Sequence, residues 1–258
     1  MKNIITSKDN PVIKLYQKLS SSKKERIQYG LFVLEGLRIT EDALKESNVS
    51  NLILTENAYD KYSAYLFQAD LRDTKTIVIS NELGNRISST GTTQGVFAIC
   101  HIPQQHTPVF RSDDKYIVLY GLQDPGNVGM IIRTADALGM DGIILSNSCD
   151  LYSPKVIRST MGSVFRTNLF IENDTERLFS MFEGNNVITS AAVIDSNEKI
   201  NECSFNGSHA VFVGNEGNGL PAEISARCNR RITIPMNGSI NSLNVAMAAG
   251  IIMWEMKK

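Results

Sequence analysis

A helix-forming stretch near the middle of the chain carries the side chain best suited to bind negative charge. In "GLQDPGNVGMIIRTADALGM" (121–140), a turn cluster precedes apolar residues at helical spacing, and Asn127 is predicted to cap that helix. Arg133 falls on the face opposite the apolar stripe, near the loop end of the helix. Its guanidinium can grip a phosphate or a developing alkoxide, although a solvated surface charge is the alternative. The stripe predicted to be buried comprises Val128, Ile131, Ile132, Ala135 and Leu138.

A second stretch, "FVGNEGNGL" (212–220), places a carboxylate inside a glycine-rich loop that follows an apolar strand. Its three glycines let a ligand approach main-chain N–H and C=O groups closely. The spacing is neither the GxGxxG dinucleotide fingerprint nor a phosphate-binding P-loop. A tight strand-to-helix turn is the alternative, but Glu216 has little packing purpose in such a turn. We therefore expect Glu216 to serve a site.

The third stretch, "IPMNGSINSLNVAMAAGI" (234–251), brings small polar side chains to the start of an almost wholly apolar helix. Ser242 or Asn241 is predicted to cap this helix, and Asn244 would then fall in its first turn, where capping does not explain it. Between residues 243 and 254 the helix is apolar on every face. It must therefore be covered all round, by its own sheet and by a second subunit.

Short apolar runs alternate with helical patterns along most of the chain, which is typical of an α/β fold. Runs that are apolar throughout imply a parallel sheet covered on both faces, and ligands bind such sheets at the carboxyl ends of the strands. We therefore expect a ligand site to be formed by the loops that follow Tyr120, Val213 and Ile234. The predicted strands are 31–36, 51–55, 76–80 and 95–100 in the first part of the chain, and 116–121, 142–146, 168–171, 186–194, 209–214 and 231–235 in the second.

A segment rich in proline, glutamine and charge, "HIPQQHTPVFRSDDK" (101–115), separates these two parts and is typical of a linker. We predict a small α/β substrate-binding domain over 1–104, a linker over 105–115 and a second α/β domain over 116–258. The four cysteines are scattered, and neither a secretory signal nor a membrane-spanning run is apparent. These features favour a reduced, cytoplasmic protein with no membrane partner.

The charge of the chain is distributed unevenly. The net charge of −1 is not the excess of positive charge that is typical of a nucleic-acid-binding protein. Residues 1–38, however, carry eight basic and three acidic side chains. Such an arm could meet phosphates, and a solvated helix face is the alternative.

Together the three stretches resemble the three ordered motifs of the SpoU/TrmH family of RNA 2′-O-ribose methyltransferases, in the SPOUT superfamily. The resemblance covers essentially the whole chain, because "TTQGVFAIC" (92–100) is similar to the family's N-terminal domain and "LYSPKVIRSTMGSVFRTNL" (151–169) to the segment after the first motif. It implies a C-terminal parallel-sheet domain tied in a deep trefoil knot, preceded by a ribosomal-protein-like α/β domain that binds RNA. It also implies bound S-adenosylmethionine (AdoMet), a homodimer through the C-terminal domain, and no metal.

The family's functional residues carry over onto the positions of this sequence that match its motifs. The implied catalytic residues are Asn127, Arg133, Glu216, Ser242 and Asn244. The implied cofactor contacts are Gly214, Gly217, Ile234, Met236 and Leu243, and the implied RNA contacts are Arg38, Arg133 and Arg158. Asn241 departs from the family pattern, since many relatives have Glu or Gln there, and this change is peripheral to the cofactor site.

The implied reaction moves a methyl group from a sulfonium to a ribose 2′-oxygen, which must lose its proton. A guanidinium stays protonated across the physiological pH range and is a poor proton acceptor. We therefore expect Arg133 to hold a phosphate and stabilise the alkoxide, while Glu216 or the RNA phosphate takes the proton. Ser242 and Asn244 are expected to hydrogen-bond across the site toward Asn127 and Glu216.

Ribosomal RNA is the preferred substrate, because the N-terminal domain resembles that of the ribosomal RNA members. Transfer RNA is the alternative substrate, and self-protection against a ribosome-targeting antibiotic is also open. A non-catalytic RNA-binding or ribosome-assembly protein would be expected to lack Arg133, Glu216 or Asn244, and all three are present. An unknotted α/β methyltransferase would carry its glycine-rich loop after the first strand, whereas here the loop follows Val213.

Overall fold

The computed structural model describes residues 3–46, 49–69, 71, 73–104, 106–239 and 242–258. The chain divides into two compact units, one formed by residues 1–104 with 150–165 and the other by residues 105–149 with 166–258. The segment 150–165 therefore groups with the first unit, although the sequence places it inside the second domain.

The first unit is built on a mixed sheet of five strands, in the order β1-β4-β3-β5-β2. The strands are β1 (Ile4–Ile5), β2 (Leu31–Glu35), β3 (Val49–Thr55), β4 (Lys75–Ile79) and β5 (Val96–His101). β1, β4 and β3 run parallel, whereas β5 is antiparallel to both of its neighbours. The strands expected at 31–36, 51–55, 76–80 and 95–100 are thus all present.

Helices cover both faces of this sheet. α1 and α5 share one apolar core with the sheet, in which Tyr16 and Leu83 pack near Phe97, and α3 and α4 contact β2, β3, β4 and β5. The helices are α1 (Pro11–Ser21), α2 (Lys23–Tyr29), α3 (Leu37–Lys45), α4 (Glu56–Leu66), α5 (Asn81–Ile87), α7 (Pro154–Ser159) and the 3-10 turn η1 (Ser163–Phe165). α4 begins at Glu56, because the Thr55 hydroxyl caps it by accepting the Ala58 N–H.

One basic side chain of residues 1–38 is buried within the first unit. Arg26 is 5% exposed, and its guanidinium donates to the Asp150 carboxylate, at 2.6 Å for the closer nitrogen, and to the Leu19 carbonyl. Removing one partner of such a buried pair leaves an uncompensated charge. Arg26 is therefore unavailable to a phosphate, whereas Lys18, Lys23 and Lys24 are exposed.

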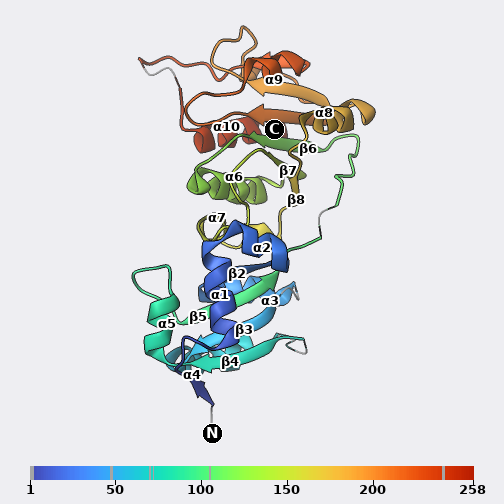
Figure 1. Cartoon of the computed structure of the whole chain (residues 1–258). Helices are drawn as coiled ribbons and strands as arrows, with labels where there is room; N and C mark the ends of the chain where they lie inside the picture. The colour runs from blue at the N-terminus through green and yellow to red at the C-terminus, as the bar shows by residue number, and fades with distance from the viewer. Residues whose placement is uncertain (1–2, 47–48, 70, 72, 105, 240–241) are drawn as a thin grey trace. The chain divides into compact units, whose positions relative to one another are not determined.

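The second unit is built on a six-stranded sheet in the order β11-β9-β10-β6-β7-β8, and every neighbouring pair runs parallel (Figure 1). The strands are β6 (Lys115–Tyr120), β7 (Gly142–Ser146), β8 (Leu169–Ile171), β9 (Ile188–Ala192), β10 (His209–Val213) and β11 (Arg230–Ile232). The predicted parallel α/β sheet is confirmed. The trefoil knot stays a prediction.

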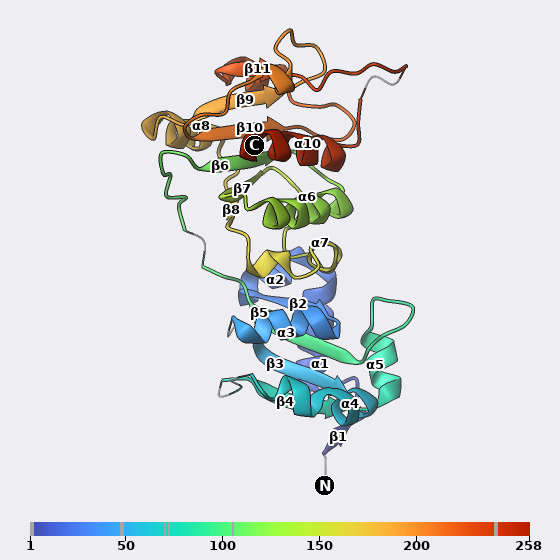
Figure 2. The same cartoon turned by 180° about the vertical axis from the view of Figure 1, so that it is seen from behind.

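Two layers of helices enclose this sheet. The helices are α6 (Pro125–Leu138), α8 (Thr175–Gly184), α9 (Ala222–Arg227), α10 (Val245–Lys257) and the 3-10 turn η2 (Ile200–Glu202). Phe179 and Phe182 of α8 and Ile224 of α9 form one core with Phe212. α6 and α10 lie side by side and contact β6, β7 and β10 (Figure 2).

A buried histidine in the second unit gives a pH-dependent contribution to stability. Burial lowers the pKa of His209 below its ordinary value of 6.5, and the Nε2 atom lies 2.9 Å from the Asn206 carbonyl oxygen. The unfolded chain then binds a proton at a pH where the folded chain does not. Below pH 6.5 the free energy of unfolding is expected to fall as pH falls, by up to about 1.4 kcal/mol per pH unit from this group.

Urea unfolding of wild type and His209→Gln at several pH values measures that contribution. The glutamine side chain keeps a donor for the Asn206 carbonyl but does not titrate. The variant should show a shallower loss of stability on acidification. Equal slopes in the two proteins would rule out His209 as the source.

No helix in the described part of the chain is both long and apolar enough to cross a membrane.

Candidate functional site

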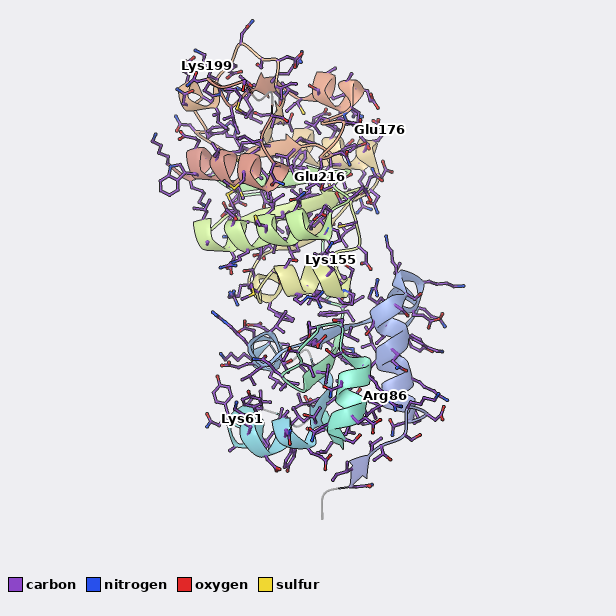
Figure 3. The ribbon with its side chains drawn as sticks, turned by 90° about the vertical axis from the view of Figure 1, so that its left-hand side faces the viewer. Lys61, Arg86, Lys155, Glu176, Lys199 and Glu216 are labelled. Atoms are coloured by element: carbon purple, nitrogen blue, oxygen red, sulfur yellow. The ribbon has the colours of Figure 1, made fainter. Side chains whose placement is uncertain are left out.

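Glu216 joins two of the three stretches that the sequence singles out. Its Oε1 atom accepts hydrogen bonds from the Asp124 N–H (3.1 Å) and the Asn127 Nδ2 (3.2 Å). Its Oε2 atom accepts the Gln123 N–H at 3.3 Å. Figure 3 shows Glu216 on the loop after β10. The loops after β6 and β10 are thereby clamped together by one carboxylate.

These hydrogen bonds set the charge state of Glu216. Partial burial raises the pKa of its carboxyl, but hydrogen bonds from its own backbone N–H, from Asn127 and from the Asp124 and Gln123 amides outweigh that effect. The net result is a pKa below the ordinary value for glutamate. Glu216 is therefore held as a carboxylate at neutral pH.

Asn244 joins the third stretch to this network. Its Nδ2 donates to Asn127 Oδ1 at 3.1 Å. Its Oδ1 accepts the N–H groups of Ala246 and Met247, so Asn244 itself caps α10. The expectation that Ser242 or Asn241 caps this helix is wrong for Ser242, and Asn241 lies outside the described residues.

Asn127 is free to bridge Glu216 and Asn244 because another residue caps α6. The Asp124 carboxylate accepts the N–H groups of Gly126 and Asn127, and Pro125 occupies the first helical position. Asn127 was expected to be the cap, and that expectation is wrong. The residues of α6 that were predicted to be buried are buried, except Leu138, which is half-buried.

The glycine-rich loop closes on itself. Asn215 and Gly219 exchange backbone hydrogen bonds of 3.0 and 2.9 Å. A side chain on Gly214 would overlap the backbone of Gly219 and Leu220. Glycine at 214 is therefore required by this close backbone approach, whereas a Cβ at Gly217 would make only an ordinary contact with Asn215.

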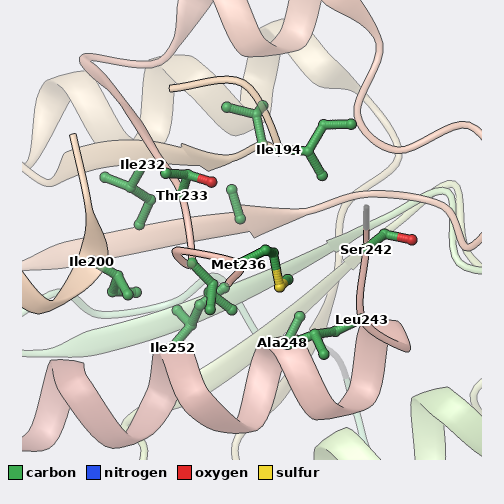
Figure 4. A pocket seen from close by; sticks show the side chains of 12 residues that line it. Ile194, Ile200, Ile232, Thr233, Met236, Ser242, Leu243, Ala248 and Ile252 are labelled. Carbon is green, nitrogen blue, oxygen red and sulfur yellow. The ribbon is translucent and has the colours of Figure 1, made fainter. Parts of the chain in front are cut away.

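An apolar cavity of about 110 Å³ lies beside the loop between β11 and α10 (Figure 4). Three of the five predicted cofactor contacts, Ile234, Met236 and Leu243, line it, and so does Ser242. Gly214 and Gly217 do not. The remaining lining residues are Ala192, Val193, Ile194, Ile200, Ile232, Thr233, Ala248 and Ile252.

The chemistry of this cavity suits AdoMet. Facing aliphatic side chains can hold the flat adenine ring. Glu216 supplies a carboxylate in the same unit for a cofactor that carries a sulfonium cation. The residues present therefore fit the group.

The loop after β9 is a part of the cavity that sequence analysis missed. Val193 and Ile194 line the cavity from this loop, next to Ala192 at the end of β9. β9 lies between β10 and β11 and runs parallel to both, so its carboxyl end falls at the same edge of the sheet. Only the strand order, which the sequence pattern does not give, would have singled this loop out. Asp124, also missed, was signalled by the Asp-Pro pair that starts α6.

Arg133 stands apart from the hydrogen-bonded network. It is exposed, and among the described residues it has neither a hydrogen bond nor an ion pair. Six residues separate it from Asn127, which places it about 9 Å along α6 and about 120° around the helix. It shares its exposed face with Met130 and Ala137. The structure thus does not bring Arg133 into contact with Glu216 or Asn244 of the same chain.

The other predicted RNA contacts, Arg38 and Arg158, belong to the first unit and are both exposed. Arg38 lies on α3. Arg158 lies on α7, where its Nη1 donates to Ser89 Oγ at 2.7 Å. In the described part of the chain, no group of three or more His, Cys, Asp or Glu side chains is arranged to hold a metal ion.

The two roles of Asn244 can be separated by substitution. Asn244→Ala removes both the helix cap and the donor to Asn127, so the free energy of unfolding should fall by about 1 kcal/mol and AdoMet affinity should fall with it. Asn244→Asp keeps a capping oxygen but has no donor for Asn127, so it should retain stability and lose affinity. Urea unfolding and calorimetric titration with AdoMet measure the two effects. Unchanged affinity in both variants would show that the Asn127 contact does not shape the site.

Comparison with known proteins gives matches over both parts of the chain. Residues 114–254 match the sequence model of the SpoU rRNA Methylase family. Residues 10–98 match that of the MRM3-like substrate binding domain.

Relatives are similar over nearly their full length. The chain is 29% identical to the 23S rRNA (guanosine(2553)-2′-O)-methyltransferase RlmP of Bacillus subtilis, with 100% of each chain covered. The crystal structure of an AdoMet-bound rRNA methyltransferase from Sinorhizobium meliloti superposes with a TM-score of 0.86 at 29% identity, covering 98% of this chain and 96% of that one. The SpoU methyltransferase AviRb from Streptomyces viridochromogenes, in complex with AdoMet, gives a TM-score of 0.88 at 26% identity over 96% and 97% of the chains.

Proposed function

The chain belongs to the SpoU rRNA Methylase family, and from this premise we propose that it transfers a methyl group from AdoMet to a ribose 2′-hydroxyl of ribosomal RNA. The observation that carries the proposal is the clamp of Glu216, Asn127 and Asn244, which ties the loops after β6 and β10 to the start of α10. Ile234, Met236 and Leu243 line a cavity at this same edge of the sheet.

AdoMet supplies an electrophilic methyl group on a positively charged sulfur. The work left to the protein is to position the 2′-oxygen in line with that methyl and to favour loss of its proton. The clamp keeps the walls of the cavity fixed before RNA arrives, so little reorganisation accompanies the reaction. The apolar lining excludes water that would compete for the methyl group.

We propose that Glu216 is a clamp and that an RNA phosphate accepts the proton. The carboxylate oxygens of Glu216 already accept four hydrogen bonds, and these occupy the lone pairs that a proton would need. The donors are the N–H groups of Gln123 and Asp124 and the side-chain amides of Asn127 and Asn215. The guanidinium of Arg133 is a poor proton acceptor as well. Its role is to hold the phosphate and stabilise the developing alkoxide.

Replacing Glu216 by glutamine tests this assignment. The amide has a single acceptor oxygen and cannot accept all four N–H donors, so AdoMet affinity and turnover should fall together, by about tenfold or more. The pH profile of kcat should keep its shape, because no titrating base has been removed. A loss of turnover with normal AdoMet affinity and a changed pH profile would instead identify Glu216 as the base.

We also propose that the exposed face of α6 and α10 is covered by a second copy of the chain. Met247 and Trp254 are 58% and 60% exposed on α10, and Met130 of α6 is also exposed. A contiguous apolar face of this kind is typical of an interface. Ala246 and Ala249, on another face of α10, are buried within their own unit.

The proposed activity is tested with deproteinised ribosomal RNA from cells that lack this protein. Purified protein and methyl-tritiated AdoMet should label that RNA, and alkaline hydrolysis should leave one resistant dinucleotide that carries the label. The same RNA from cells that contain the protein should accept little label. Label on a base, or label only in transfer RNA, would overturn the proposal.

A further inference from the structure

The turn that follows α7 inverts the usual pattern of burial. The polar residues Thr160 and Ser163 are buried, whereas the apolar side chain of Met161 between them is 49% exposed. The Thr160 hydroxyl is satisfied inside the turn, because it donates to the Ile157 carbonyl at 2.7 Å. Burial of apolar surface is the main force in folding, so folding alone does not explain why Met161 faces solvent.

Met161 also adopts a backbone conformation that L side chains avoid. Its φ is +51°, where the Cβ atom is crowded by the backbone. The chain ends α2 and α6 with glycine at such a position, at Gly30 (φ +62°) and Gly139 (φ +63°). Among the described residues, the other non-glycine residues with positive φ are asparagines, a type that tolerates it. A large side chain thus occupies a position where glycine would strain the backbone less.

The segment that carries Met161 is firmly anchored to the first unit. Arg26 holds Asp150 at its start. The ring of Phe32 on β2 packs against Tyr152, with centroids 5.1 Å apart, and against Phe165, at 6.4 Å. Met161 therefore projects from a rigid support, which limits the entropy that a contact with a partner would cost.

The surroundings of Met161 identify the chemistry of that partner. Lys155 (labelled in Figure 3) and Arg158 are exposed on α7, and Asp150 is neutralised by Arg26, so the exposed charge of residues 150–165 is positive. Arg158 contacts Ser89, whose hydroxyl also donates to the Glu35 carboxylate. Lysine and arginine side chains bind the phosphate oxygens of nucleic acids.

We propose that Met161 is a positioning residue for the RNA substrate, its side chain packing against the face of an unstacked base while Lys155 and Arg158 hold adjacent phosphates. Methionine is apolar and polarisable, and apolar side chains inserted at base steps hold nucleic acids in distorted conformations. Sequence-specific RNA recognition targets unpaired bases whose faces are free to stack. This inference rests on the proposed function, because it takes ribosomal RNA as the partner.

Three variants test the inference with the ribosomal RNA described above as the probe. Met161→Gly removes the side chain and relieves the backbone, so Tm should stay equal or rise while kcat/KM for RNA falls about tenfold. Met161→Leu keeps an apolar side chain and should stay within about threefold of wild type. Asn186→Gly is the matched control, because Asn186 is also exposed at positive φ (+54°) after a helix, α8, and its replacement should leave kcat/KM unchanged.

The readouts separate the possible failures. AdoMet affinity should be the same in all three variants, since a role in RNA positioning does not involve the cofactor cavity. Wild-type kcat/KM in Met161→Gly would overturn the inference and leave the proposed function standing. A drop in Tm together with AdoMet affinity would show a structural role for Met161 and also overturn it. If wild type labels no ribosomal RNA, the proposed function itself fails.

Discussion

Replacing Arg133 by alanine is expected to reduce methyl transfer to ribosomal RNA by about 10²–10³-fold while leaving the protein folded and AdoMet bound. Arg133 is exposed and does not line the cavity, so neither stability nor cofactor affinity depends on it. Arg133→Lys keeps the charge but loses the two-pronged geometry that grips a phosphate, so an intermediate activity is expected. Single-turnover transfer, Tm and AdoMet affinity measure the three quantities.

The position of Arg133 also predicts which subunit's cavity it serves. It lies on the exposed face of α6 with Met130, which we propose a second copy covers, and it has no contact with Glu216 or Asn244 in its own chain. We therefore expect Arg133 to act on the RNA held at the partner's cavity. A heterodimer of Arg133→Ala with a cavity-blocked subunit, Leu243→Arg, should then recover activity, because one intact site combines the cavity of the first with the arginine of the second.

The two variants alone serve as controls for that mixture. Each homodimer should be far less active than the heterodimer, since every site lacks either the arginine or the cavity. An inactive heterodimer would place Arg133 at the cavity of its own chain. A normal rate in the Arg133→Ala homodimer would remove Arg133 from the mechanism altogether.

Replacing Gly214 by alanine is expected to have the largest effect on the architecture of the site. The added Cβ would collide with the backbone of Gly219 and Leu220, which cannot move without breaking the hydrogen bonds between Asn215 and Gly219. The free energy of unfolding should fall by about 1–3 kcal/mol. Glu216 would shift with the loop, so its bonds to the loop after β6 should fail and AdoMet binding should be lost.

Gly184→Ala is the control for this substitution. Gly184 ends α8, and a Cβ there would meet no atom within 4 Å. Alanine should leave AdoMet binding unchanged and stabilise the protein slightly, because it reduces the entropy of the unfolded chain. Urea unfolding and calorimetric titration compare the two proteins. Normal AdoMet affinity in Gly214→Ala would show that the loop after β10 is not part of the site.

The sequence pattern was sufficient to locate ten of the eleven described strands, all except β1, and the three loops. Apolar runs flanked by turn residues are local properties, and each of the ten predicted strands is present. The glycine at 214 and the carboxylate at 216 were recognisable as unusual for the same reason. The residues that cap helices were harder to predict. Asn127 and Asp124 are both of a type that caps helices well, and Asp124 is the cap because Pro125 fixes the first turn of α6.

Periodicity and turn chemistry depend on neighbours along the chain, so the residues alone predict the α/β elements, the parallel second sheet and the polar residues that follow its strands. Three features became known only from the three-dimensional arrangement: Asn244 caps α10 while it bridges to Asn127, the loop after β9 lines the cavity, and Arg133 lies away from the clamp in its own chain. Each of these depends on strand order and helix rotation. Those are set by packing between segments that are distant in sequence, and no local pattern encodes them.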